Sequence, residues 1–237
     1  MNLDELVVHT KVNRFQQNNF TRKRMRGEET PLSERGKAIQ TARQIFLSSG
    51  CCILPDVLPI AFVEDCHKQA TEDLESLQET MRQTKSKAIA TSNVHLLTAT
   101  QRVDFAEMIA RDGNRLDVRY NLDSLVPTEL IHHPVVYPLM RELLGSNVIL
   151  LYAGVMWAMK SEESQKWHAD GGHLFAEDDH HSPPHCINVF YPLVDLSKEN
   201  GATQVQLGTH RRDCDKESVA TLPLQVDAGG AILFDYR

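Results

Sequence analysis

The sequence lacks the cysteine spacing of a disulfide framework or a zinc ribbon. No C-x-x-C pair occurs, and the number of cysteines is odd. They stand at Cys51, Cys52, Cys66, Cys186 and Cys214. Irregularly spaced cysteines of odd number are typical of a reducing compartment, so we expect free thiols and a cytoplasmic protein.

The sequence also lacks the features of membrane and nucleic-acid binding proteins. No apolar run is long enough to span a bilayer, and the start, Met-Asn-Leu-Asp-Glu, has no apolar core of a signal peptide. The net charge of -7 is opposite to the basic face that nucleic acid requires. We therefore expect neither of those partners; the oligomeric state has no signature in the sequence.

The composition is that of a globular protein without internal repeats. The chain has 237 residues, of which 41% are hydrophobic and 24% charged. Residues 1–33 are polar and predict a poorly ordered N-terminal segment. Residues 34–237 are long enough to form one domain with a substantial core.

The first half of the chain has the apolar spacing of helices. The predicted helices span residues 33–50, 58–84, 102–110 and 127–144. His132 and His133 lie inside the last of these. Adjacent helical residues point about 100° apart, so these two histidines cannot easily share an ion and are interpreted as structural.

The second half changes to the pattern of strands. Residues 148–159 predict a long buried strand with a bend or bulge at Gly154. Shorter strands are predicted at residues 187–196, 204–207, 222–226 and 231–236. Helices followed by punctuated strands indicate an α+β fold whose β half is a barrel or sandwich.

A candidate metal site follows the long predicted strand. His168 and Asp170 are separated by one residue, and in an extended chain residues two apart point to the same face. An imidazole nitrogen and a carboxylate oxygen suit Fe(II), Mn(II) or Zn(II). A set of two histidines and one carboxylate with open positions suits iron-dependent oxygen chemistry.

The third ligand is open from the sequence. His173 could close a local site with His168 and Asp170. The remaining histidines of this region are interpreted as solvated loop residues or a non-specific metal patch, namely His180, His181 and His185.

Further motifs follow the H-x-D pair in a recognisable order. They read L-V-D-L at residues 193–196, N-G-A-T at 200–203, L-G-T-H at 207–210 and G-G-A-I-L-F-D-Y-R at 229–237. Together with W-H-A-D at residues 167–170, they resemble the signature of the phytanoyl-CoA dioxygenase family of Fe(II)/2-oxoglutarate oxygenases. The resemblance covers roughly residues 43–237.

The resemblance implies a double-stranded β-helix, also called a jelly roll and cupin-like, with the N-terminal helices packed on one sheet. It implies that His168 and Asp170 bind iron and that 2-oxoglutarate chelates the same iron. Thr203 matches a position that contacts the cosubstrate in relatives. Lys166 stands where many relatives carry a glutamine in the same pocket. No catalytic residue beyond the metal ligands is implied.

The implied reaction is hydroxylation of an unactivated C–H bond of a small organic substrate. It consumes O₂, converts 2-oxoglutarate to succinate and CO₂, and can use ascorbate as a reductant. The family's second histidine ligand and its carboxylate-binding arginine follow the F-D-x-R strand, where this sequence stops. The resemblance therefore predicts a C-terminally incomplete domain of low turnover, with His210 as a candidate replacement ligand.

Two other functions are compatible with the same residues. One is a non-catalytic jelly-roll binding module that has lost the metal ligands. The other is a zinc-dependent hydrolase in which His168, Asp170 and either His173 or His210 hold zinc together with a water molecule.

Overall fold

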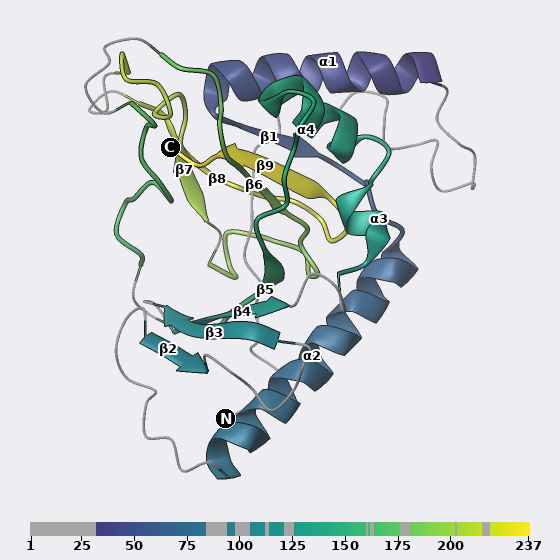
Figure 1. Ribbon diagram of the computed structural model, residues 1–237, viewed down its shortest axis with the longest axis vertical. Helices are drawn as coiled ribbons and strands as arrows, with labels where there is room; N and C mark the ends of the chain where they lie inside the picture. Colours follow the sequence, from purple (N-terminus) through teal and green to yellow (C-terminus); the bar gives the residue numbers. More distant parts are fainter. Residues whose placement is uncertain are drawn as a thin grey trace. The chain divides into compact units, whose positions relative to one another are not determined.

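The computed structural model describes most of the chain after residue 31 (Figure 1). The described residues are 32–83, 94–97, 105–111, 114–120, 126–159, 161, 164–175, 181–201, 203–214 and 219–237. The predicted polar N-terminal segment therefore lies almost wholly outside them. The chain predicted as one domain divides into two compact units, whose described parts fall in residues 61–131 with 149–167, and in residues 32–60 with 132–148 and 168–237.

The first unit combines a long helix with a four-stranded antiparallel sheet. Its elements are α2 (Ile60–Gln83), β2 (Val94–Leu97), β3 (Phe105–Arg111), β4 (Arg115–Tyr120), the short helix α3 (Thr128–Ile131) and β5 (Ala153–Ala158). The strands are hydrogen-bonded in the order β2-β3-β4-β5. The long helix predicted from residue 58 is confirmed.

A side-chain hydrogen bond links this sheet to α2. Leu116 and Val118 of β4 are buried, and Trp157 lies opposite Leu116 on β5. Tyr120, two residues beyond Val118, donates its hydroxyl hydrogen to Asp73 Oδ2 of α2 at 3.0 Å. Because alternate residues of a strand share a face, this hydrogen bond orients the apolar face of β4 towards the helix.

The helix predicted for residues 102–110 is wrong. Residues 105–111 form β3, which pairs with β4 as an antiparallel hairpin. Asn114, at the turn, has a φ of 56° that asparagine tolerates. Alanine, glutamate and methionine in this segment favour a helix locally, but pairing with β4 overrides that weak preference. The sequence analysis also missed β2 and β4.

The long strand predicted over residues 148–159 is shorter, and the predicted bulge at Gly154 is wrong. Pairing between β4 and β5 continues without a shift from Arg115 to Tyr120, with Gly154 opposite Arg119. A side chain at Gly154 would overlap the carbonyl oxygen of Val118. The glycine therefore allows close approach of two backbones.

The second unit packs two helices with antiparallel strands. Its elements are α1 (Leu32–Ser49), β1 (Cys51–Leu54), α4 (Val136–Leu144), β6 (Ile187–Phe190), β7 (Gln204–Gln206), β8 (Thr221–Pro223) and β9 (Ala231–Asp235). One sheet has the order β1-β9-β6, and β7 pairs with β8. Figure 1 shows α1 and α4 side by side above the strands β1 and β9. Helices with antiparallel sheets confirm the α+β class.

The turn between α1 and β1 follows the prediction that the helix ends at Gly50. Its φ is 79°, a left-handed conformation that glycine adopts without strain. The Gly50 N–H donates to Phe46 O at 2.8 Å and closes the last turn of the helix. The chain then enters β1 directly.

The helix predicted over residues 127–144 is interrupted. The segment forms α3 and α4, with His132 and His133 between them rather than inside one helix. Pro134 disfavours a helical backbone at the residue before it. His133 is buried; its Nε2 donates to Val57 O at 2.8 Å, and its Nδ1 accepts from Val136 N at 3.3 Å. These bonds fix the start of α4, which agrees with a structural role.

The sheet β1-β9-β6 has two different faces. Residues opposite one another in the register share a face, and one face carries Cys51, Ile53, Ile232, Phe234 and Phe190. This face, called the inner face below, packs against the buried residues Leu196, Leu224 and Val226. It forms the apolar core next to which the candidate site is built.

Burial keeps the thiols of β1 neutral. It raises the pKa of Cys51 to about 12 and also raises the pKa of Cys52, which points to the opposite face. All five cysteines are free thiols. None of the described helices is long and apolar enough to cross a membrane.

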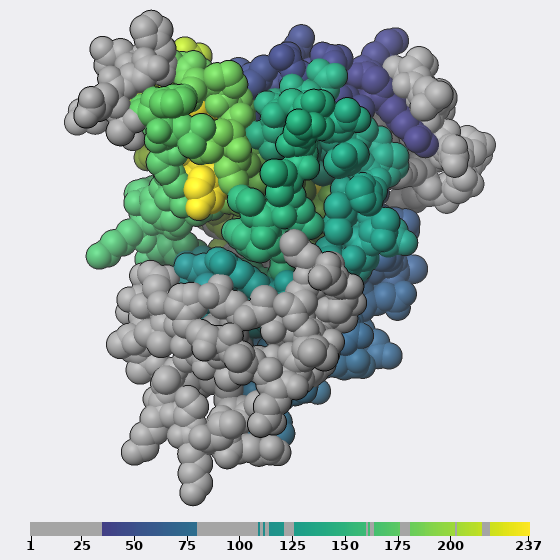
Figure 2. Space-filling model, viewed as in Figure 1, coloured from purple at the N-terminus to yellow at the C-terminus, as the bar shows by residue number. Residues whose placement is uncertain are grey.

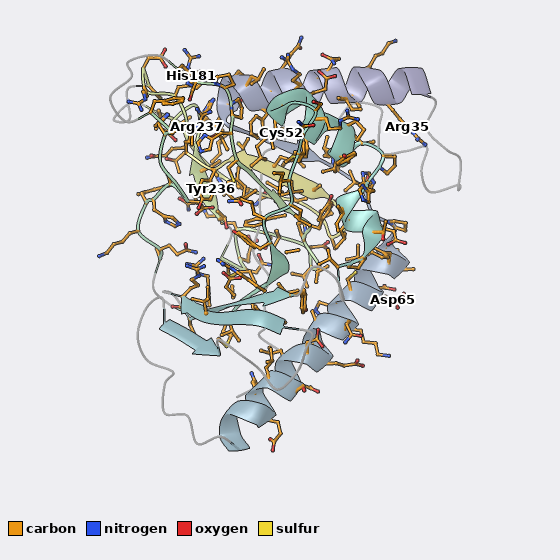
Figure 3. The ribbon with its side chains drawn as sticks, viewed as in Figure 1. Arg35, Cys52, Asp65, His181, Tyr236 and Arg237 are labelled. Carbon is orange, nitrogen blue, oxygen red and sulfur yellow. The ribbon has the colours of Figure 1, made fainter. Side chains whose placement is uncertain are left out.

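A buried ion pair lies at the end of β9. Arg237 donates from Nε and Nη2 to the two carboxylate oxygens of Asp235, each at 2.8 Å. Its Nη1 donates to Ser182 O at 2.8 Å, and the side chains of Arg237 and Asp235 are 0% and 1% exposed. Figure 3 labels Arg237 at the end of the chain, and Figure 2 shows the yellow C-terminal residues as a small patch. The pair joins β9 to the segment before β6.

We expect Asp235→Ala to lower the free energy of unfolding by about 3–5 kcal/mol, because it leaves the Arg237 charge buried without its partner. Chemical denaturation measures the change. Asp213→Ala is the matched control. Asp213 also forms a bidentate pair with an arginine two residues away, Arg211, but both side chains are solvent-exposed. Equal losses in the two variants would contradict the buried pair's role.

Candidate metal centre

The predicted pair of metal ligands comes together in an irregular segment. Residues 164–169 form no regular strand, so His168 and Asp170 do not lie at the end of β5 as the sequence suggested. Their side chains nevertheless meet, with 3.5 Å between His168 Nε2 and Asp170 Oδ1. The one-residue spacing is therefore sufficient to place both donors on one side of the chain.

The two donor atoms fit a single metal ion. Imidazole nitrogen and carboxylate oxygen bind such ions at about 2.0–2.2 Å, so a separation of 3.5 Å allows one ion to contact both. The side chains are 54% and 35% exposed, which leaves room for further ligands. The donor set suits Fe(II), Mn(II) or Zn(II).

Asn188 of β6 holds the carboxylate, and the sequence analysis missed it. Its Nδ2 donates to Asp170 Oδ2 at 2.6 Å. The other oxygen, Oδ1, faces His168. The signal that could have found Asn188 is its polar side chain within the apolar strand Ile187–Phe190.

The backbone after Asp170 is fixed to the ends of β9 and β6. The Gly171 N–H donates to Tyr236 O at 2.7 Å, and the Tyr236 N–H donates to Cys186 O at 3.2 Å. A side chain at Gly171 would overlap the ring of Tyr236. This contact therefore requires glycine directly after the candidate ligand.

No third ligand joins the pair among the described residues. There, no three side chains of histidine, cysteine, aspartate or glutamate are grouped so as to hold an ion. His173 is half-buried, and burial and nearby Arg212 lower its pKa. His180 lies outside the described residues. His181 is exposed, although its pKa is lowered chiefly by desolvation.

His210 is buried beneath the end of α1. Its Nε2 lies 3.3 Å from Leu47 O, and its ring contacts the backbone of Gly50 so closely that a side chain there would overlap it. His181 packs edge-on against the ring, with 5.6 Å between centroids. These contacts join the L-G-T-H turn to α1, so a structural role accounts for this histidine without a metal.

The L-V-D-L and N-G motifs form a connected turn. Asp195 Oδ1 accepts from Ala228 N at 2.8 Å. Asn200 donates from Nδ2 to Asp195 O at 2.7 Å and accepts the N–H of Ser197 at 2.8 Å. Gly201 has a φ of 76°, so the turn predicted at Asn200 and Gly201 is confirmed. These motif residues stabilise the turn by hydrogen bonds to backbone groups.

The two predicted cosubstrate residues lie in described segments. Thr203 is half-buried and its carbonyl oxygen accepts from Leu224 N at 3.0 Å. Lys166 is exposed. Their roles in binding a cosubstrate stay predictions.

Comparison with known proteins identifies the family. The family described as "Phytanoyl-CoA dioxygenase (PhyH)" matches residues 46–237. The chain belongs to the phytanoyl-CoA dioxygenase family. The matched region includes His168, Asp170 and every motif from which the resemblance was recognised, so this prediction is confirmed.

The chain is similar to parts of longer proteins. The chain is 28% identical over 116 residues to "Dioxygenase olcK" of Penicillium canescens, covering 45% of this chain and 38% of that protein. The match to the crystal structure of EvdMO1 covers 84% of this chain and 44% of the EvdMO1 chain, with 18% sequence identity and a TM-score of 0.47. The chain thus spans less than half the length of these relatives.

We expect Gly171→Ala to weaken Mn(II) binding by roughly tenfold or more, because the new methyl group overlaps the Tyr236 ring and displaces the backbone that carries Asp170. Calorimetric titration of the metal-free protein measures the affinity. Gly172→Ala is the matched control, since a side chain there meets nothing within 4 Å. Unchanged affinity in Gly171→Ala would show that the tight contact does not position the ligand.

We expect His210 to make the folded metal-free protein less stable at acidic pH. Burial, the largest cause, lowers its pKa below the ordinary value of 6.5, so the unfolded chain binds the proton more readily. Its contribution is present above pH 6.5 and is lost as the pH falls further. His210→Gln should show a shallower fall of unfolding free energy between pH 7 and about pH 5. The same slope in both proteins would contradict this.

Proposed function

We propose that the protein is an Fe(II)/2-oxoglutarate-dependent oxygenase that hydroxylates an unactivated C–H bond of a small organic substrate. Family membership supports the oxygenase class. The observation that carries the metal assignment is the 3.5 Å separation of His168 Nε2 and Asp170 Oδ1. We also propose that the antiparallel strands belong to a jelly-roll core, as in the family.

His168 and Asp170 are the residues that would hold the iron. When bound, iron with O₂ and 2-oxoglutarate supplies the oxidising power for hydroxylation, while 2-oxoglutarate is converted to succinate and CO₂. His168 would supply an imidazole nitrogen to the ion, and Asp170 would supply a carboxylate oxygen. The solvent exposure of both side chains leaves space for non-protein ligands.

We propose Thr203 and Lys166 as residues that contact the cosubstrate. The Thr203 hydroxyl can donate to or accept from a carboxylate, and the Lys166 ammonium group carries a charge opposite to that of 2-oxoglutarate. The family correspondence supports Thr203. Lys166 stands where many relatives carry a glutamine, so the family correspondence does not support its role. Its role is supported by the opposite charges of the lysine and 2-oxoglutarate.

We expect His168→Ala and Asp170→Ala each to weaken Mn(II) or anaerobic Fe(II) binding by at least tenfold, because each removes one of two donors to the same ion. Titration of the metal-free protein measures the affinity. His67→Ala is the matched histidine control, since His67 lies within helix α2 and not in the H-x-D segment. Wild-type protein that binds neither ion would overturn the proposed function.

The reaction is tested by measuring succinate from 2-oxoglutarate with Fe(II) and ascorbate. Succinate formation should depend on Fe(II) and fall to background in His168→Ala and Asp170→Ala. Zinc should not replace iron, because it has no redox chemistry. Turnover of an ester or phosphoester with zinc, without succinate formation with iron, would favour the hydrolase instead.

A further inference from the structure

Asn188 is a polar residue on an apolar sheet face. It lies opposite Phe234 of β9 and two residues before Phe190, so its side chain shares the inner face with both. The rings of Phe190 and Phe234 pack edge-on with 4.9 Å between centroids. An amide that is partly buried beside this aromatic pair loses contacts with water, and a hydrogen bond to another group compensates for that loss.

The partner that Asn188 finds is the candidate metal ligand. Its Nδ2 lies 2.6 Å from Asp170 Oδ2, a short bond from an amide N–H to a carboxylate. Asp170 Oδ1 faces His168 Nε2 at 3.5 Å. The two carboxylate oxygens are thus divided, one bound to β6 and the other directed to the imidazole.

We propose that Asn188 is a positioning residue that fixes the Asp170 carboxylate with Oδ1 directed towards the metal ion. The proposal rests on the metal site of the proposed function and adds the residue that selects the coordinating oxygen. Asn188 does not touch the ion; it acts through Asp170. In metalloproteins, carboxylate ligands are commonly oriented by hydrogen bonds from residues of this kind.

The physical reason is the mobility of an isolated aspartate in an irregular segment. The terminal torsion of aspartate has a broad, two-fold profile, so either oxygen could face the imidazole and the plane could tilt. Asn188 removes this freedom before the ion arrives. Because β6 is paired to β9 along its length, the donor is mounted on a rigid element rather than on a loop.

The anchor works together with the backbone contact at Gly171. The hydrogen bond from Gly171 N to Tyr236 O fixes the main chain just after Asp170, while Asn188 fixes the side chain. Tyr236 follows β9 directly, and β9 is the strand to which β6 is paired. Both constraints on Asp170 thus come from the same pair of strands.

Asn188→Leu tests the proposal, because leucine has the same branched side chain but no hydrogen-bond donor. Quenching of tryptophan fluorescence by Mn(II) measures binding. The chain has two tryptophans; Trp167, directly before His168, is 57% exposed, whereas Trp157 is 1% exposed. Loss of quenching in Trp167→Phe assigns the signal.

We expect the Mn(II) dissociation constant to rise by about 10- to 100-fold in Asn188→Leu, the usual effect of losing such a partner. The visible absorption spectrum of bound Co(II), which reports ligand geometry, should change as well. A purely structural amide would lower the unfolding midpoint without altering either signal.

Gln69→Leu is the matched control. Gln69 donates from its side-chain amide to Asp73 Oδ1 at 3.1 Å within α2, so the substitution removes the same kind of bond to a carboxylate. It should lower the unfolding midpoint and leave the Mn(II) affinity within twofold of the wild type. If Asn188→Leu does not fold, Asn188→Ser, which is too short to reach Asp170, replaces it with the same expectation.

The outcomes separate the two hypotheses. Wild-type protein without Mn(II) affinity overturns the proposed function. Wild-type binding that Asn188→Leu and Asn188→Ser retain within twofold, with an unchanged Co(II) spectrum, overturns the role of Asn188 alone.

Discussion

The pairing of β9 between β1 and β6 is the constraint on which the second unit depends. β9 joins the strand that follows α1 to the strand that carries Asn188, although β1 and β9 are separated by most of the sequence. Its residues Ala231, Ile232 and Leu233 are fully buried. Pairing β1 with β9 brings together distant parts of the chain, which costs conformational entropy. Burial of these apolar residues offsets that cost.

The candidate metal centre inherits its geometry from this pairing. Asp170 lies in an irregular segment, and such segments rarely hold a ligand precisely by themselves. Here the segment is fixed to Tyr236 after β9 and to Asn188 on β6. The buried pair of Asp235 and Arg237 adds a third tie, through Ser182, to the segment that leads into β6. In this unit, the position of Asp170 therefore depends on the pairing of β6 with β9.

The motifs shared with the family divide into two physical classes. His168 and Asp170 carry donor atoms that lie 3.5 Å apart, a separation that one metal ion could bridge. Asp195, Asn200 and Gly201 instead satisfy backbone groups and permit a left-handed turn. The first class consists of candidate metal ligands and the second stabilises the fold, and sequence similarity alone does not separate them.

The sequence by itself determined the α+β class, the long helix α2, the end of α1 at Gly50 and the pairing of His168 with Asp170. These features depend on local periodicity, on glycine's backbone freedom and on a one-residue spacing. Only the tertiary structure decided that residues 105–111 form a strand, since their helical preference is weaker than pairing with β4. It alone also brought Asn188 to Asp170, because a contact between distant residues depends on strand register, which the sequence of one strand does not specify.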